Sequence, residues 1–213
     1  MWIAPPLILV FISTAGCIWF AYHGPRWMFY VLKPLTMVLI CLTAIMGGNS
    51  LPVYKMLIIG GLVCSLAGDI FFMLPSDRFL AGLSAFLLAH LCYITAFASG
   101  IISLSWWPLI PLIIWGIWFY LFISPALGKL KTPVIIYIVI ISIMTWLAWE
   151  RWIQTGQTGT LLVLIGAVLF AISDTILAAN RFKGTFKPAQ ALNLATYFAA
   201  QFLIASSVGM LVR

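Results

Sequence analysis

The chain has 213 residues, of which 64% are hydrophobic and only 7% carry a formal charge, and its net charge is +7. Soluble domains carry about 25% charged residues, so this composition excludes a soluble enzyme or a soluble binding module. The positive charge fits anionic lipid headgroups and does not indicate nucleic acid, because no basic soluble segment exists to hold a duplex. The composition predicts an all-α, multi-pass integral membrane protein.

Eight stretches of the chain are long enough to be transmembrane helices, each of which needs about 20 mostly apolar residues. The connections between them are short and contain Gly, Pro, Asn or charged residues, and the alternating pattern of a membrane barrel is absent. We therefore predict one domain, 1–213, that is a polytopic bundle of eight transmembrane helices. The predicted spans are 3–22, 28–46, 52–74, 79–99, 105–123, 133–149, 160–179 and 189–211.

The distribution of basic residues predicts the orientation of these spans, because cytoplasmic connections are enriched in Lys and Arg. One face carries eight basic residues and the opposite face carries three. We expect the richer face in the cytoplasm and both termini outside. The richer face holds Arg26, Lys33, Arg78, Lys129, Lys131, Arg181, Lys183 and Lys187, and the other holds Lys55, Arg151 and Arg213.

Two of the four acidic residues fall inside predicted spans. Asp69 lies in "LAGDIFFML" of the third span, and Asp174 lies in "FAISDTILAAN" of the seventh. Both spans run toward the cytoplasm, so the rise of about 1.5 Å per residue puts both carboxyl groups roughly 8 Å inside that face. A charge in hydrocarbon costs on the order of 3 kcal/mol, which makes both residues candidates for function. Asp77, in a loop, and Glu150, at the far interface, are expected to be solvated.

Other polar residues are predicted at a similar depth in the cytoplasmic half. His90 and Tyr93 are about one turn apart in the fourth span, Tyr197 and Gln201 are four residues apart in the eighth, and Lys33 opens the second. Each also fits an ordinary structural role, as an interhelical hydrogen bond or, for Lys33, as a snorkelling side chain.

Short similarities between the two halves predict a 4+4 parallel repeat. "LKP" opens the second span and "KTP" opens the sixth, while "SLAGD" in the third corresponds to "FAISD" in the seventh. Each pair is separated by four spans, so the direction is kept and the repeat axis runs along the membrane normal. Asp69 and Asp174 are then equivalent and are expected to face one another.

Two facing carboxyl groups at low dielectric cannot both ionise easily, so one is expected to stay protonated. Such a pair provides a general acid and a general base at neutral pH. No metal or other cofactor is expected, because a catalytic zinc site needs three protein ligands and the only histidines are His23, in a loop, and His90. No spacing typical of a Ser/His/Asp triad is evident.

Five segments together resemble the YhhN-like membrane proteins, the family of animal lysoplasmalogenases, over nearly the whole chain and in the same order. Met37 departs from the pattern, in which a second Thr follows "KPLT". The segments are "KPLTM" (33–37), "GDIFFML" (68–74), "GLSAFLLAHLCY" (82–93), "SD" (173–174) and "YFAAQFLI" (197–204).

This resemblance implies eight helices and hydrolysis of the vinyl ether of lysoplasmalogen, a lysophospholipid, to a fatty aldehyde and a glycerophospho-base. We expect the protein in the inner membrane of a bacterium. Asp69 and Asp174 match the catalytic positions, and we expect their carboxyl groups within about 7 Å or bridged by one water. The alternatives are a proton-coupled transporter and a hydrolase of another lysolipid. The residues expected around the two acids, to bind substrate, are Lys33, His90, Tyr93, Tyr197 and Gln201, with His90 and Tyr197 lining one cavity.

Overall fold

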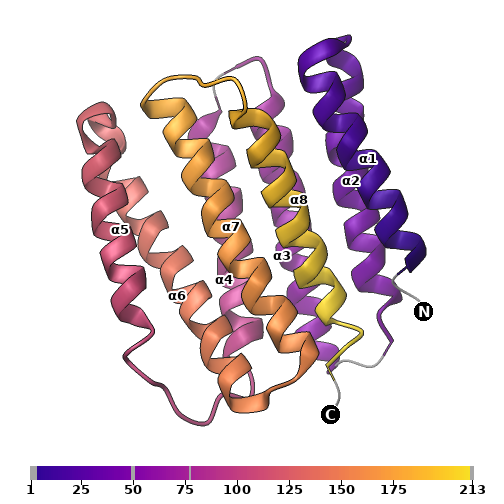
Figure 1. The fold of residues 1–213 in the computed structure, drawn as a ribbon, viewed down its shortest axis with the longest axis vertical. Coiled ribbons are helices and arrows are strands. Elements are labelled where there is room, and N and C mark those ends of the chain that lie inside the picture. The colour runs from indigo at the N-terminus through magenta and orange to yellow at the C-terminus, as the bar shows by residue number, and fades with distance from the viewer. Residues whose placement is uncertain (1–3, 49–50, 77, 212–213) are drawn as a thin grey trace.

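A computed structural model describes residues 4–48, 51–76 and 78–211. Over these residues the chain forms eight α-helices, two short 3₁₀ helices and no strand, and Figure 1 shows the helices side by side in a bundle. The helices are α1 (Ala4–His23), α2 (Arg26–Met46), α3 (Pro52–Met73), α4 (Phe79–Ala98), α5 (Leu109–Ile123), η1 (Ser124–Ala126), η2 (Gly128–Leu130), α6 (Lys131–Thr155), α7 (Thr158–Phe182) and α8 (Ala189–Ser207).

Seven of the described helices, α1 to α7, are long and apolar enough to cross a membrane, with η1 and η2 extending the spans of α5 and α6. Large apolar side chains such as Phe11, Ile114 and Leu121 are exposed on the outer helices, where lipid can cover them. The protein is therefore a helical, multi-pass membrane protein. The eighth helix, α8, is more polar and packs against α7, α1, α2 and α3 (Figure 1).

The interior position of α8 explains its composition. Tyr197, Gln201, Ser206 and Ser207 are all buried on this helix, so they face neighbouring helices rather than lipid. A helix that is enclosed by other helices can carry hydrogen-bonding side chains, which would be costly on a lipid-exposed surface.

The length of α6 corrects one prediction from the sequence. The sixth span was predicted to end at residue 149, but α6 continues to Thr155 and takes Glu150 and Arg151 into the interior, where they are 1% and 7% exposed. Arg151 donates hydrogen bonds to the carbonyl oxygens of Ala96 and Ser99 at the C-terminal end of α4. The guanidinium group thus satisfies carbonyl groups that lack partners within their own helix, and neither charged residue is a solvated interface residue.

The other predicted helix boundaries differ less from the structure. The fifth span begins at Leu109 instead of residue 105, and α8 ends at Ser207 instead of residue 211. The predicted loop position of Asp77 and the outer position of Arg213 concern residues outside the described ranges.

A glycine allows α7 and α8 to approach closely. A Cβ atom at Gly166 would lie 2.8 Å from Cγ1 of Ile204 and 3.0 Å from the carbonyl oxygen of Ala200. Since part of this obstacle is backbone, the helices themselves would have to separate. Gly166 therefore sets the packing distance between α7, which carries Asp174, and α8, which carries Tyr197.

We expect Gly166→Leu to destabilise the protein by about 1–3 kcal/mol, as overpacking of a tight core does. Thermal unfolding in detergent measures this loss. Gly48→Leu is the matched control, because a Cβ atom at Gly48 meets nothing within 4 Å. Equal unfolding temperatures for the two variants would contradict the role given to Gly166.

Candidate functional site

Asp69 is held by partners from two other helices. The side chain lies on α3 and is only 1% exposed. Its Oδ1 lies 2.8 Å from Nζ of Lys33 on α2, and its Oδ2 accepts a 2.8 Å hydrogen bond from the hydroxyl of Tyr197 on α8. The ammonium group neutralises the carboxylate at contact distance, which is the arrangement that allows a buried acid to remain ionised.

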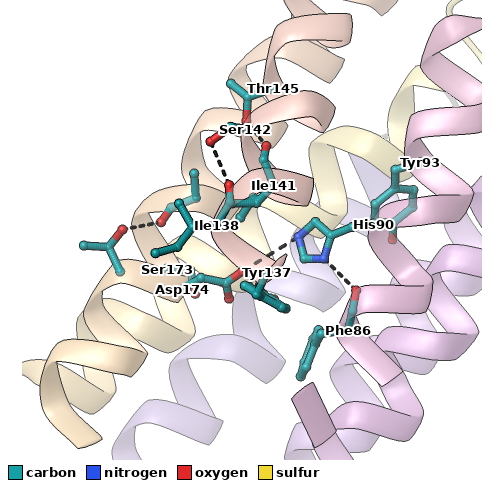
Figure 2. A network of polar contacts seen from close by, with 12 residues as sticks. Phe86, His90, Tyr93, Tyr137, Ile138, Ile141, Ser142, Thr145, Ser173 and Asp174 are labelled. Carbon is teal, nitrogen blue, oxygen red and sulfur yellow. Dashed lines mark hydrogen bonds and ion pairs between the residues drawn. The ribbon is translucent and has the colours of Figure 1, made fainter. Parts of the chain in front are cut away.

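Asp174 has different neighbours, which Figure 2 shows. The hydroxyl of Tyr137 on α6 donates a 2.7 Å hydrogen bond to Oδ2, and Nε2 of His90 on α4 lies 3.8 Å from the same oxygen. No Lys or Arg forms an ion pair with Asp174 among the described residues. This carboxyl group therefore faces a phenol and an imidazole instead of an ammonium group.

The position of His90 fixes which of its nitrogens carries hydrogen. Nδ1 lies 2.6 Å from the carbonyl oxygen of Phe86, and a carbonyl oxygen only accepts, so Nδ1 is the donor. Nε2 has no hydrogen-bond partner within the described part of the chain. Figure 2 shows this nitrogen facing Asp174, and in a neutral imidazole with its hydrogen on Nδ1 it carries the lone pair of the ring.

Aromatic rings contact the partners of both carboxyl groups. The ring of Phe170 contacts His90 at 4.7 Å on one side and Tyr197 at 5.7 Å on the other, measured between ring centroids. The ring of Phe86 also contacts Tyr197, at 5.8 Å. Apolar groups thus surround the partners of both acids and lower the local dielectric, which strengthens each polar interaction in the layer.

Tyr93 and Gln201 form a separate link. The hydroxyl of Tyr93 donates a 2.7 Å hydrogen bond to Oε1 of Gln201, and both side chains are fully buried. The bond ties α4 to α8 beside the ring of Phe170. This is the ordinary structural role for polar residues inside a membrane bundle.

A large cavity opens next to Lys33, and we call it the basic cavity. Its volume is about 770 Å³, which is within the usual range for a small-molecule site. Four cationic side chains line it, and its described lining residues include no carboxylate; several amides and hydroxyls add hydrogen-bonding groups. The polar lining residues are Arg26, Lys33, Arg78, Arg181, Asn180, Gln190, Asn193, Ser76, Thr185 and Tyr30.

A second, mainly apolar groove contains Asp174 and Tyr137, and we call it the apolar groove. It runs between α4, α5, α6 and α7, and aromatic and aliphatic side chains make up nearly all of its lining. Phe72, Phe79 and Leu177 line both this groove and the basic cavity, so the two spaces share a wall.

The YhhN family matches residues 28–208 of this chain. The chain belongs to the YhhN family. It is 32% identical over 189 residues to the membrane protein YhhN of Escherichia coli O157:H7, covering 88% of this chain and 90% of that protein. It is 31% identical over 209 residues to lysoplasmalogenase TMEM86B of Rattus norvegicus (97% and 83% covered) and 29% identical over 212 residues to that of Homo sapiens (97% and 85%). No solved structure matches the chain.

In this member of the YhhN family, the predicted site residues fall into three groups: Lys33, Asp69 and Tyr197; His90 with Asp174; and Tyr93 with Gln201. His90 and Tyr197 are not among the residues that line the two cavities described above, and both side chains are buried among aromatic rings. That the two residues line one cavity stays a prediction.

Tyr137 is the residue at this YhhN site that sequence reasoning missed. It is a single tyrosine in the apolar run "TPVIIYIVI", with no neighbouring polar residue to mark it. Arg26, Arg78 and Arg181 were recognised only as charges that set the orientation, although all three line the basic cavity. Among the described residues, no group of three His, Cys, Asp or Glu could hold a metal ion.

Proposed function

We propose that this protein is a lysoplasmalogenase-type hydrolase that cleaves the vinyl ether of lysoplasmalogen with Asp69 and Asp174 as its acid–base pair. The observation that carries the proposal is the difference between the surroundings of the two acids: Asp69 is ion-paired with Lys33, whereas Asp174 contacts Tyr137 and His90. Carboxyl groups in environments that differ in this way take opposite roles, one as base and one as acid. Relatives named lysoplasmalogenase support the same reaction class.

The basic cavity provides the headgroup site in this proposal. A phosphate group is recognised by clustered Arg and Lys side chains, and Arg26, Arg78 and Arg181 surround the cavity with Lys33 at its inner end. A lysolipid whose phosphate binds these groups has its glycerol and vinyl ether close to the two acids. Lys33 then contacts both the bound headgroup and Asp69.

Protonation of the vinyl ether begins the reaction. Asp174, in its protonated form, gives its proton to the β-carbon of the double bond, and the α-carbon becomes an oxocarbenium ion. The ionised Asp69 stabilises this cation and takes a proton from the water that attacks it. The resulting hemiacetal breaks its bond to the glycerol oxygen, which takes up the proton that Asp69 accepted. As the carbonyl group of the aldehyde forms, the hydroxyl of the hemiacetal gives its proton to Asp174, so both acids return to their starting states. The products are a fatty aldehyde and a glycerophospho-base.

The experiment that tests this function is mass spectrometry of the purified protein incubated with lysoplasmalogen. We expect a fatty aldehyde and a glycerophospho-base in equal amounts. A panel of acyl, saturated-ether and amide lysolipids serves as the specificity control. Release of product only from one of those other lysolipids would replace the vinyl ether with a different substrate, and release from none would overturn the proposed activity.

We also propose that the protein lies in the inner membrane of a bacterium, with α8 as an eighth crossing, both termini outside and the basic cavity at the cytoplasmic side. Arg26, Arg78 and Arg181 line this one cavity together, and their clustering supports the orientation because cytoplasmic ends are rich in basic residues. The cavity would then open toward the headgroup layer of the inner leaflet.

A membrane-impermeant maleimide tests this orientation in intact cells. We expect Phe186→Cys, in the connection between α7 and α8, to react only after the cells are permeabilised. Ile102→Cys, at an exposed position between α4 and α5, is the matched control and should react from outside. The reverse pattern of labelling would invert the topology, and the wild-type protein measures any reaction of native cysteines.

The parallel repeat is proposed on the pattern of packing as well as on the sequence. In a 4+4 repeat α2, α3 and α4 correspond to α6, α7 and α8. Asp69 on α3 has partners on α2 and α8, and Asp174 on α7 has neighbours on α6 and α4. Exchange of the two halves converts one set of helices into the other, as a two-fold axis along the membrane normal requires.

A further inference from the structure

Apart from the carboxyl group of Asp174, the apolar groove has a lining that offers little for water to bind. Trp115, Phe119, Val134 and Ile138 form one side, and Ala178 lies opposite on α7. Its two hydroxyl groups already have partners, because Tyr137 donates to Asp174 and the hydroxyl of Thr175 donates to the carbonyl oxygen of Ala171. A groove of this kind favours a hydrocarbon occupant over a polar one.

The position of the groove indicates which hydrocarbon this is. Phe72, Phe79 and Leu177 line both the groove and the basic cavity, so the two spaces lie against one another with these three side chains as their common wall, and a molecule that occupies both would pass along this wall. One space is cationic and the other apolar. The molecule that complements both has an anionic headgroup joined to a hydrocarbon chain.

We propose that the apolar groove binds the hydrocarbon chain of the lysolipid whose phosphate occupies the basic cavity. This inference rests on the proposed function and adds where the hydrocarbon chain of the substrate binds. The carbons next to glycerol then pass Asp174, which is the one carboxylic acid among the described residues of the groove, and the vinyl ether is the first group of the chain to reach it. The remainder of the chain follows the inner face of α5.

The outer wall of the groove suits a long chain. α5 packs mainly on α6 and only lightly on α7, and its opposite face exposes Ile113, Ile117 and Leu121 where lipid can lie. A chain that leaves the groove along α5 enters hydrocarbon directly. The protein therefore needs to bind only the first carbons, and the end of the chain stays in the bilayer.

Photocrosslinking tests the position of the chain without any turnover. The probe is a saturated 1-O-hexadecyl glycerophosphocholine, which has no vinyl ether to hydrolyse, and it carries a diazirine on one of the first carbons of its chain. After irradiation of the detergent-solubilised protein, we expect mass spectrometry to find labels on the groove-lining residues of α5 and α7, such as Phe119 and Ala178. Excess unlabelled lysolipid should reduce the labelling of these residues at least tenfold.

Two variants sharpen the test. Ala178→Phe fills the groove and should reduce the labelling of Phe119 about tenfold, whereas Ile117→Phe adds the same ring on the exposed face of α5 and should leave it within about twofold. Labelling that falls mainly on lipid-facing residues such as Ile117, or that Ala178→Phe does not change, would overturn the chain site. If Ala178→Phe fails to fold, the wild-type labelling pattern alone decides between these results.

The crosslinking experiment tests the chain site, and the aldehyde-release experiment tests the proposed function, so either one can fail without the other. Groove labelling by the saturated probe, together with absence of aldehyde release from lysoplasmalogen, would retain the chain site and reject the vinyl ether reaction. Normal aldehyde release, together with labels confined to lipid-facing residues, would retain the reaction and reject the chain site.

Discussion

Asp69→Asn and Asp174→Asn should each lower aldehyde release from lysoplasmalogen by about 100- to 10,000-fold, the range that a positioned proton donor or acceptor contributes. Asparagine keeps the size of the side chain and can still accept the hydrogen bond from Tyr197 or Tyr137. It can neither donate a carboxylic proton to the β-carbon nor take a proton from water. The loss should therefore appear in kcat, while binding of a saturated-ether lysolipid changes far less.

The matched control for this experiment is Glu150→Gln. Glu150 is 1% exposed, like Asp69. It lies near the C-terminal end of α6, away from Tyr137, and accepts a hydrogen bond from Ser105. Its amide variant should release aldehyde at close to the wild-type rate. If either aspartate variant keeps more than about a tenth of wild-type activity in a folded sample, the two-carboxylate mechanism is wrong.

Lys33→Met should destabilise the protein by about 3–5 kcal/mol, because it leaves the carboxylate of Asp69 buried without its cation. Both members of the pair are largely enclosed, with side-chain exposures of 11% for Lys33 and 2% for Asp69. Removing both charges in Lys33→Met/Asp69→Asn should recover most of the lost stability. Thermal or denaturant unfolding of the two single variants and the double variant in detergent gives the interaction energy directly.

Lys129→Met removes an ammonium group from an exposed position and is the control for the loss of positive charge alone. It should unfold at the wild-type temperature. A Lys33→Met protein of unchanged stability, with only a raised KM for lysolipid, would mean that Lys33 serves the headgroup and contributes nothing to holding Asp69. Because Asp69→Asn also breaks this pair, its activity should be compared with wild type at a temperature where both are shown to be folded.

The sequence by itself determined the class of protein and the position of its helices. Hydropathy is a local property, so the apolar runs predicted all eight helices, and the similarity to the YhhN family is confirmed by the match over residues 28–208. The two acids were identified from the sequence for the same reason, since a carboxyl group within an apolar run is visible without knowledge of its neighbours. The predicted end of a helix is wrong where tertiary contacts extend that helix. The interior hydrogen-bond partners of Arg151 extend α6 in this way.

Only the tertiary structure decided which residues surround each acid. In a soluble helix the polar face indicates the rotation of the helix, but a helix in lipid is apolar on nearly all sides, so its sequence does not reveal which side chains point inward. Tyr137 therefore remained unnoticed although it donates directly to Asp174. Likewise, the sequence treated Asp69 and Asp174 as equals, whereas packing gave Lys33 to one of them and His90 to the other.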